Sequence, residues 1–316
     1  MSLSAGASAV RKPRWKVALS AIMGVLCFSL LVWMVWQAGP RQLWATLCSM
    51  PLTIALCVVV WAVGYLLNAA SFRHVIAGVL RSRVETTTAD ADAAQPAADV
   101  PSFVRVLRLT VAGYALNYIT PFGLLGGEPW RIVQLRPTMG TRLATQSVVH
   151  YSLMHVASHF CLWLLSLGLA MATVPSWRQV VGHPRIVVAV LLILLALLVG
   201  WLWHKLPSLA FVRALVLELL SRLVNVVEYW AVMQALGYNQ FGYVQALLVV
   251  AFSSLLANIL FFSPMQLGTR EAGILLALEA LLPGQLLPVA LTLSFATRIR
   301  EFIWIAIGLL CMRGKK

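Results

Sequence analysis

Two short stretches of the chain combine helix-breaking residues with adjacent charges, a pattern suited to binding a phosphate group. Residues 117–131 read Asn-Tyr-Ile-Thr-Pro-Phe-Gly-Leu-Leu-Gly-Gly-Glu-Pro-Trp-Arg, and residues 258–271 read Asn-Ile-Leu-Phe-Phe-Ser-Pro-Met-Gln-Leu-Gly-Thr-Arg-Glu. A guanidinium binds phosphate bidentately, and a helix N-terminus also attracts anions. The candidate binding residues are Asn117, Gly126, Gly127, Glu128, Arg131, Asn258, Gly268, Arg270 and Glu271.

The same charges have a structural interpretation. Glu128 with Arg131, and Glu271 with Arg270, could neutralise each other and the broken backbone as local clips. One such motif would favour that interpretation. Its repetition favours a functional site, because charges embedded beside broken helices are costly and typical of substrate paths.

Two apolar segments in the C-terminal half of the chain carry further embedded charges. Glu218, Arg222 and Asn225 follow one another at i, i+4 and i+7, so they form one stripe of a helix. This stripe is either an internal ion pair or part of a lipid path.

The last apolar segment carries Arg298, Arg300 and Glu301 in its middle. Arg298 and Glu301 are spaced to pair at i, i+3. Arg300 then needs a partner from elsewhere, for which Glu228 and Glu271 are the candidates.

A histidine-containing helix face follows the first motif. Ser147, Tyr151, His155 and His159 recur every four residues and are expected to line a polar cavity. The two histidines could ligate a metal ion, but the segment lacks the glutamate of the zinc-protease signature and a clear third ligand. We therefore expect no metal and no cofactor. No nucleophile elbow, Walker loop or dinucleotide motif is present either, so the sequence gives no positive sign of an enzyme.

Composition defines the environment that must position these residues. Of 316 residues, 61% are hydrophobic and 11% charged, and the mean hydropathy is +0.87. These values predict an all-α polytopic membrane protein. The net charge of +14 is spread over short loops, so it indicates the positive-inside rule and anionic lipid headgroups and not a nucleic-acid partner.

Loop charges predict about seven transmembrane helices and two re-entrant hairpins in one domain, residues 1–316. Residues 1–16 form a basic cytoplasmic N-terminus, and residues 73–100 a flexible cytoplasmic loop. The predicted spans include 17–36, 52–71, 147–172, 186–203, 211–236 and 286–312. Both termini are then cytoplasmic.

The two motifs lie at the centres of the predicted hairpins, residues 103–145 and 243–282. Treating the first as two ordinary spans would place arginines in lipid, and the return segment of the second is too short to cross. The first hairpin enters from the cytoplasm and the second from outside. This is the arrangement of an inverted repeat with a central substrate site.

The motifs resemble those of the lysylphosphatidylglycerol synthase transmembrane family, also called the flippase-like domain family. This family includes the membrane half of the multiple peptide resistance factor and membrane proteins of hopanoid and dolichol pathways. The matching residues are Asn117, Pro121, Gly126, Gly127, Glu128 and Arg131, then Pro264, Gly268, Arg270 and Glu271. Gly-Gly-Glu-Pro departs from the family's commoner Gly-Glu, which indicates a subfamily whose lipid the sequence does not identify.

The resemblance implies a lipid-transporting flippase of the cytoplasmic membrane, or an accessory role in membrane lipid or glycolipid biogenesis. By analogy Glu128, Arg131, Arg270 and Glu271 would act on an anionic or phosphate-bearing headgroup. With no aminoacyl-transferase domain before Lys316, lysyl transfer is not expected. Two alternatives stay open: an intramembrane transferase or hydrolase using Glu128 with a histidine, and a scaffold bound to a lipid-synthesis enzyme.

Overall fold

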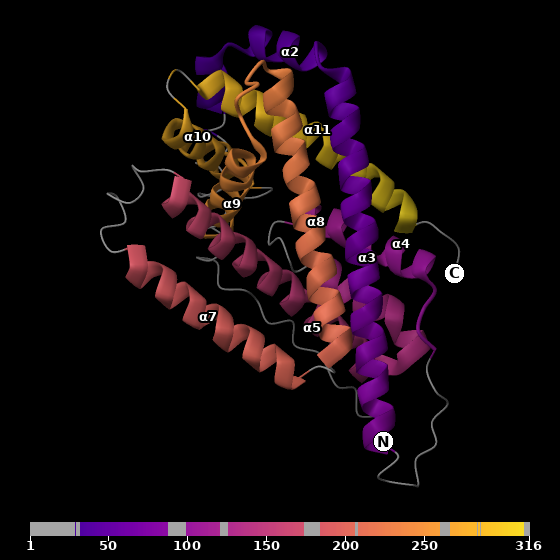
Figure 1. Cartoon of the computed structure of the whole chain (residues 1–316). Coiled ribbons are helices and arrows are strands. Elements are labelled where there is room, and N and C mark those ends of the chain that lie inside the picture. The colour runs from indigo at the N-terminus through magenta and orange to yellow at the C-terminus, as the bar shows by residue number, and fades with distance from the viewer. Residues whose placement is uncertain are drawn as a thin grey trace, which may run out of the picture.

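The computed structural model is helical throughout the part of the chain that it describes (Figure 1). It describes residues 29, 32–87, 99–120, 126–173, 184–205, 208–259, 266–282, 284 and 286–312. Within these ranges the helices are α2 (Pro40–Cys48), α3 (Pro51–Thr87), α4 (Phe103–Ile119), α5 (Gly127–Thr173), α7 (Pro184–Lys205), α8 (Ser208–Ala235), α9 (Tyr243–Ile259), α10 (Thr269–Leu281) and α11 (Leu287–Met312).

Helices α3 and α8 form the central seam of the bundle and run side by side in Figure 1. Trp61 contacts Glu228, whereas Ser71 further along α3 contacts Ala214 near the start of α8. The two helices are therefore antiparallel. Helix α2 lies across one end of the bundle, and α7 lies at its edge beside α5 (Figure 1).

Two pairs of helices meet at the sequence breaks. Helix α4 has 17 residues and is followed after the first break by α5, while α9 also has 17 residues and is followed by the 13-residue α10. A Cβ at Gly127 would overlap the carbonyl oxygen of Gly113, and one at Gly273 would lie 2.9 Å from the Cα of Ser253. Glycine at these positions therefore allows each pair to pack closely.

Helix α5 is kinked at Gly140. Gly140 has φ 77° and ψ 163°, a conformation open to glycine, and Pro137 lies just before it. The helix otherwise continues from Gly127 to Thr173. The predicted boundary between a hairpin ending at 145 and a span beginning at 147 is therefore wrong, since the change of direction lies at Gly140.

The predicted flexible loop over 73–100 is also wrong for its first half. Helix α3 continues to Thr87, and residues 88–98 lie outside the described residues. Phe72, Val75 and Ile76 are buried, whereas Arg73 and Arg81 are exposed. Up to Ser82 the segment is thus an amphipathic helical extension, with Arg73 and Arg81 on the outer face and apolar residues packed inward.

The other predicted spans correspond to helices with shifts of a few residues. Segments 186–203, 211–236 and 286–312 match α7, α8 and α11. Helix α2 was not predicted, because its nine residues with Pro40 at the start were interpreted as a loop. The basic N-terminus 1–16 and most of the first span, 17–36, lie outside the described residues.

Two of the described helices are long and apolar enough to cross a membrane by length and composition. They are residues Pro51–Ser82, with mean hydropathy 2.1, and Gly127–Thr173, with mean hydropathy 1.6. Apolar residues pack in two clusters. One joins α2 with α9, α10 and α11, and the other joins α3 with α4 and α5. Each cluster therefore supports one of the two breaks.

Candidate functional site

The first break is closed by the side chains of its own motif. Asn117 at the end of α4 accepts a hydrogen bond from the backbone N–H of Gly127 at 2.6 Å, and its Nδ2 donates to Glu128 at 3.2 Å. Arg131 forms an ion pair with the same Glu128 oxygen at 3.2 Å. Asn117 therefore ties α4 to the start of α5, where backbone N–H groups lack helical partners.

Arg131 is inside the bundle, with 1% of its surface exposed. Its guanidinium donates to the carbonyl oxygens of Leu109 and Thr110, both at 3.3 Å. It also lies 5.2 and 5.4 Å from the ring centres of Tyr114 and Tyr151. Burial, carbonyl acceptors and aromatic rings together fix this cation in place.

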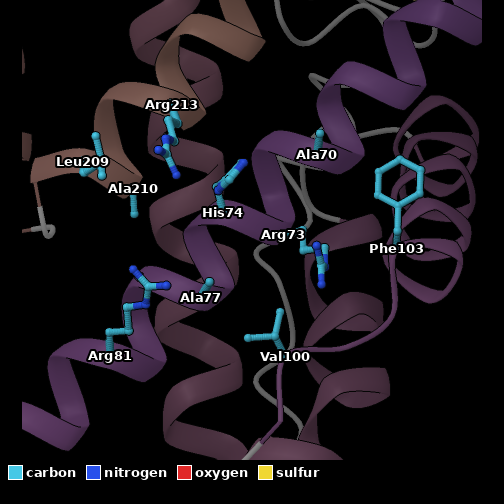
Figure 2. A pocket seen from close by; sticks show the side chains of 11 residues that line it. Ala70, Arg73, His74, Ala77, Arg81, Val100, Phe103, Leu209, Ala210 and Arg213 are labelled. Carbon is cyan, nitrogen blue, oxygen red and sulfur yellow. The ribbon is translucent and has the colours of Figure 1, made fainter.

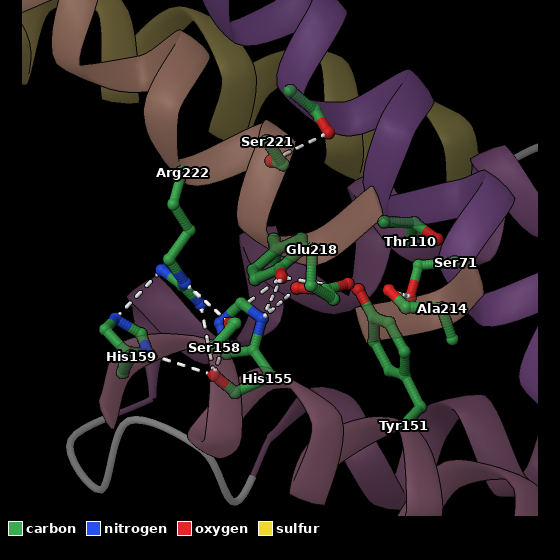
Figure 3. Close-up of polar contacts among 12 residues, drawn as sticks. Ser71, Thr110, Tyr151, His155, Ser158, His159, Ala214, Glu218, Ser221 and Arg222 are labelled. Carbon is green, nitrogen blue, oxygen red and sulfur yellow. Dashed lines mark hydrogen bonds and ion pairs between the residues drawn. The ribbon is translucent and has the colours of Figure 1, made fainter. Parts of the chain in front are cut away.

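A second polar cluster joins α5 to α8 near the first break (Figure 3). His155 Nδ1 lies 3.0 Å from Glu218 Oε2 and 3.0 Å from the Tyr114 hydroxyl. Glu218 is fully buried, and the His155 side chain is 18% exposed. The pairing of an imidazole with a carboxylate holds the ring in one orientation, as it does in many sites that move protons.

Arg222 lies one helical turn further along α8 and contacts the same face of α5 (Figure 3). Its Nε donates to Ser158 Oγ at 2.8 Å, and its Nη1 lies 2.9 Å from His159 Nε2. A third donor reaches the carbonyl oxygen of His155 at 3.4 Å. Of the two interpretations left open for this stripe, an internal ion pair or part of a lipid path, the structure shows Glu218 and Arg222 each contacting side chains of α5.

The second break is organised by Glu271 of α10. Its Oε2 accepts from the backbone N–H of Gly268 at 2.7 Å, and its Oε1 accepts from Ser294 Oγ and Arg298 Nε, each at 2.7 Å. Glu271 is fully buried. At this break a carboxylate fills the role that Asn117 has at the first break.

Arg270 points to a different partner from its neighbour. It forms an ion pair with Glu301 of α11 and donates to Tyr229 Oη at 2.9 Å and Thr297 Oγ1 at 3.0 Å. Its side chain is 12% exposed. Arg270 thus pairs with Glu301 and Glu271 with Arg298, so these contacts differ from the local clip between Arg270 and Glu271 that the structural interpretation of the motif describes.

Arg300 and Glu228 form the most enclosed ion pair of the site. Two donors of Arg300 each lie 3.0 Å from an oxygen of Glu228, and both side chains are almost fully buried. The Trp61 indole donates to Glu228 at 2.5 Å and packs against the Arg300 guanidinium, 3.7 Å from the ring centre. The sequence analysis named Glu228 as a candidate partner of Arg300, and this contact is confirmed.

Aromatic rings connect the charges of the two breaks. Tyr114, which contacts His155, packs on Tyr65 of α3 with ring centres 5.5 Å apart. Tyr65 packs in turn on Trp61 at 5.7 Å. Trp61 then contacts Glu228, the partner of Arg300. Arg300 also lies 3.7 Å from Glu301, the partner of Arg270, so polar and aromatic side chains connect the first break to the second.

The remaining sequence-predicted residues are spread more widely. Asn258 is exposed and donates to the Ser254 carbonyl of its own helix at 2.7 Å. Asn225 faces Gly64 on α3. Ser147 is buried beside Met139. Among the described residues no group of three His, Cys, Asp or Glu side chains could hold a metal ion.

Several contributing residues were missed by the sequence analysis. Tyr114, Tyr65 and Trp61 make the link between the breaks, and Tyr229 binds Arg270. Their only sequence signal is an amphipathic aromatic residue in an apolar helix, a type of residue that usually finds a polar partner when buried. That signal does not identify the partner.

Comparison with known proteins gives one family match. No curated protein matches the sequence. The model of a family described as lysylphosphatidylglycerol synthase transmembrane region matches residues 15–308, nearly the whole chain. The chain therefore belongs to the lysylphosphatidylglycerol synthase transmembrane region family.

Proposed function

We propose that this protein moves a phosphate- or sugar-bearing lipid between the two leaflets of a cytoplasmic membrane. The family and the apolar helices make the chain a membrane-embedded protein with a lipid-related role. The proposal also includes a topology of about seven transmembrane spans, two re-entrant hairpins at the breaks and cytoplasmic termini. The observation that carries it is the line of paired charges and aromatic rings joining the two breaks inside an apolar bundle.

The paired charges suit a headgroup that exchanges partners. Four glutamates form ion pairs with four arginines: Glu128 with Arg131, Glu301 with Arg270, Glu271 with Arg298 and Glu228 with Arg300. A buried arginine that loses its carboxylate is costly unless another anion replaces it. A lipid phosphate that takes the place of a carboxylate keeps the guanidinium paired throughout.

The exposed fractions of the side chains indicate which of them would contact the headgroup first. Glu128 and Arg270 have 19% and 12% of their side chains exposed, whereas Arg131 and Arg300 have 1% each. We assign the first contact with phosphate to Arg270 and contact with headgroup hydroxyl or amine groups to Glu128. Within the described residues, Oε2 of Glu128 is buried and has no hydrogen-bond partner, so the carboxylate keeps one unused acceptor.

Transport is tested by reconstituting the purified protein in vesicles. The readout is the fraction of headgroup-labelled phospholipid, or polyprenyl-phosphate lipid, that becomes accessible to an impermeant quencher. We expect the double variants Glu128→Gln with Arg131→Gln, and Arg270→Gln with Glu301→Gln, to lose at least about tenfold in rate. Each replaces both members of a pair, which avoids leaving a buried unpaired charge.

Exposed residues on the same two helices supply the controls. Arg136→Gln on α5 and Glu279→Gln on α10 change surface charges and should leave the rate unchanged. If both double variants elute as the wild type does and still transport lipid at the wild-type rate, the proposal is contradicted. A scaffold role would instead be supported by co-purification with a lipid-synthesis enzyme and full function of both double variants in cells.

A lipid-modifying enzyme is the second candidate, and one contact favours it. His155 is oriented by Glu218 at 3.0 Å, an arrangement that general acid–base catalysis uses. Glu128, the partner expected from the sequence, pairs with Arg131 instead. Formation of a modified lipid in the same vesicles without transbilayer movement, lost in His155→Gln, would favour this candidate over transport.

A further inference from the structure

A basic cavity lies away from both breaks, between the end of α3 and the starts of α4 and α8. Its volume is about 310 Å³. Its lining residues are Ala70, Arg73, His74, Ala77, Gly78, Arg81, Val100, Phe103, Leu209, Ala210 and Arg213. None of them belongs to the ion pairs of the candidate site described above.

The charged lining of this cavity is entirely of one sign. It contains Arg73, Arg81 and Arg213 beside His74, and among the described residues no carboxylate lines it. Figure 2 shows Arg213 of α8 reaching toward His74 of α3, with Arg81 two turns further along α3. Asp99, which precedes Val100, is exposed and is not part of the lining.

The helix ends at the cavity add to its positive potential. Leu209 and Ala210 belong to the first turn of α8, and Phe103 is the first residue of α4. The N-terminus of a helix carries a partial positive charge and backbone N–H groups without helical partners. The first turns of two helices therefore border a cavity lined by arginines, and their partial positive charge adds to the attraction of an anion.

The rest of the lining is apolar or small. Val100, Phe103 and Leu209 form apolar walls, and Phe103 and Leu209 are exposed. Ala70, Ala77 and Gly78 recur on one face of α3 and leave the floor of the cavity open. The site therefore offers cations for a phosphate and apolar surface beside them. A free inorganic anion would use only the first of these features.

We propose that this cavity binds the phosphate headgroup of an anionic membrane lipid, with the start of its acyl chains against Phe103 and Leu209. Guanidinium groups bind phosphate oxygens bidentately, and basic pockets between membrane helices favour such headgroups. The site is separate from the proposed transport path. It binds its lipid at equilibrium without requiring that the protein transport anything.

Binding is tested on the full-length protein in neutral detergent. The readout is the Tm during titration with dioctanoyl phosphatidylglycerol, dioctanoyl phosphatidylcholine or inorganic phosphate. We expect a saturable rise in Tm with phosphatidylglycerol alone. The triple variant Arg73→Gln, Arg81→Gln and Arg213→Gln should weaken that response about tenfold or more. All three side chains are exposed, so folding should be retained.

Two matched variants separate the cavity from general surface charge. Arg108→Gln, Arg136→Gln and Arg142→Gln remove the same charge from other exposed positions and should keep the wild-type response. Ala77→Leu fills the floor without changing charge and should weaken lipid binding. A wild-type response in the variant with Arg73, Arg81 and Arg213 replaced, or in Ala77→Leu, overturns the proposal. Equal stabilisation by inorganic phosphate would assign the cavity to a soluble phosphate and overturn the lipid assignment.

Discussion

Neighbouring charges in the second motif take different partners because of their positions on the helix. Arg270 and Glu271 are adjacent in sequence, and adjacent helical side chains point about 100° apart. Arg270 therefore reaches Glu301, and Glu271 reaches Arg298 and Ser294. All of these partners are on α11. The two ion pairs thus join the short helix α10 to the last helix and fix the position of the break.

Glu271→Ala tests this role of a single carboxylate. The change leaves Arg298 buried without its carboxylate and removes the acceptor of the Gly268 N–H. We expect a loss of about 3–5 kcal/mol in the free energy of unfolding. Glu279→Ala, at an exposed position on the same helix, is the control and should change stability by less than about 0.5 kcal/mol. Unfolding in mixed micelles measures both, and equal losses would contradict the assigned role.

At the level of elements, the start of α5 depends on close contact with α4. Gly127 lies against the backbone of Gly113, and Gly113 in turn lies against the Arg131 side chain. A methyl group at either position needs space that the carbonyl oxygen or the guanidinium occupies. The glycines of the first motif therefore set the distance between the two helices of the break, and with it the position of Arg131.

Gly127→Ala tests this close approach, with Gly168→Ala as its control on the same helix. Gly127→Ala should destabilise the protein by about 1–3 kcal/mol and disturb Arg131, because the new methyl overlaps the Gly113 carbonyl. Gly168 has no atom within 4 Å of an added Cβ, so alanine there should be neutral or stabilise by up to about 1 kcal/mol. Thermal unfolding in detergent compares the two. A Gly127→Ala protein as stable as Gly168→Ala would disprove the packing role.

The sequence predicted long apolar helices better than it predicted their ends and contacts. Helix α11 begins at Leu287, one residue from the predicted start, because an uninterrupted apolar run has few alternatives in a membrane. The helical extension of α3 beyond Arg73 was missed because arginines on one face also fit a solvated loop. The partners of Arg270 and Glu271 depend on how α10 meets α11, which neither helix encodes alone.

Across the whole molecule the two halves have similar successions of helices. A 17-residue helix precedes each break, a close glycine contact follows it, and a charged residue of the next helix binds the broken backbone or its neighbours. The details differ, since Asn117 closes the first break and Glu271 the second. The proposed inverted repeat would make the two halves diverged copies that enter the membrane from opposite sides.

Cysteine accessibility tests this inverted arrangement directly. In a background with the five native cysteines replaced by serine, Arg136→Cys reports the side of α5 after the first break, and Asn239→Cys reports the loop before α9. Both positions are exposed. An impermeant maleimide added to intact cells should label Asn239→Cys at once and Arg136→Cys only after permeabilisation, because the first hairpin enters from the cytoplasm and the second from outside. Labelling of both cysteines in intact cells, or of neither, would place the two hairpins on the same side and exclude the inverted repeat.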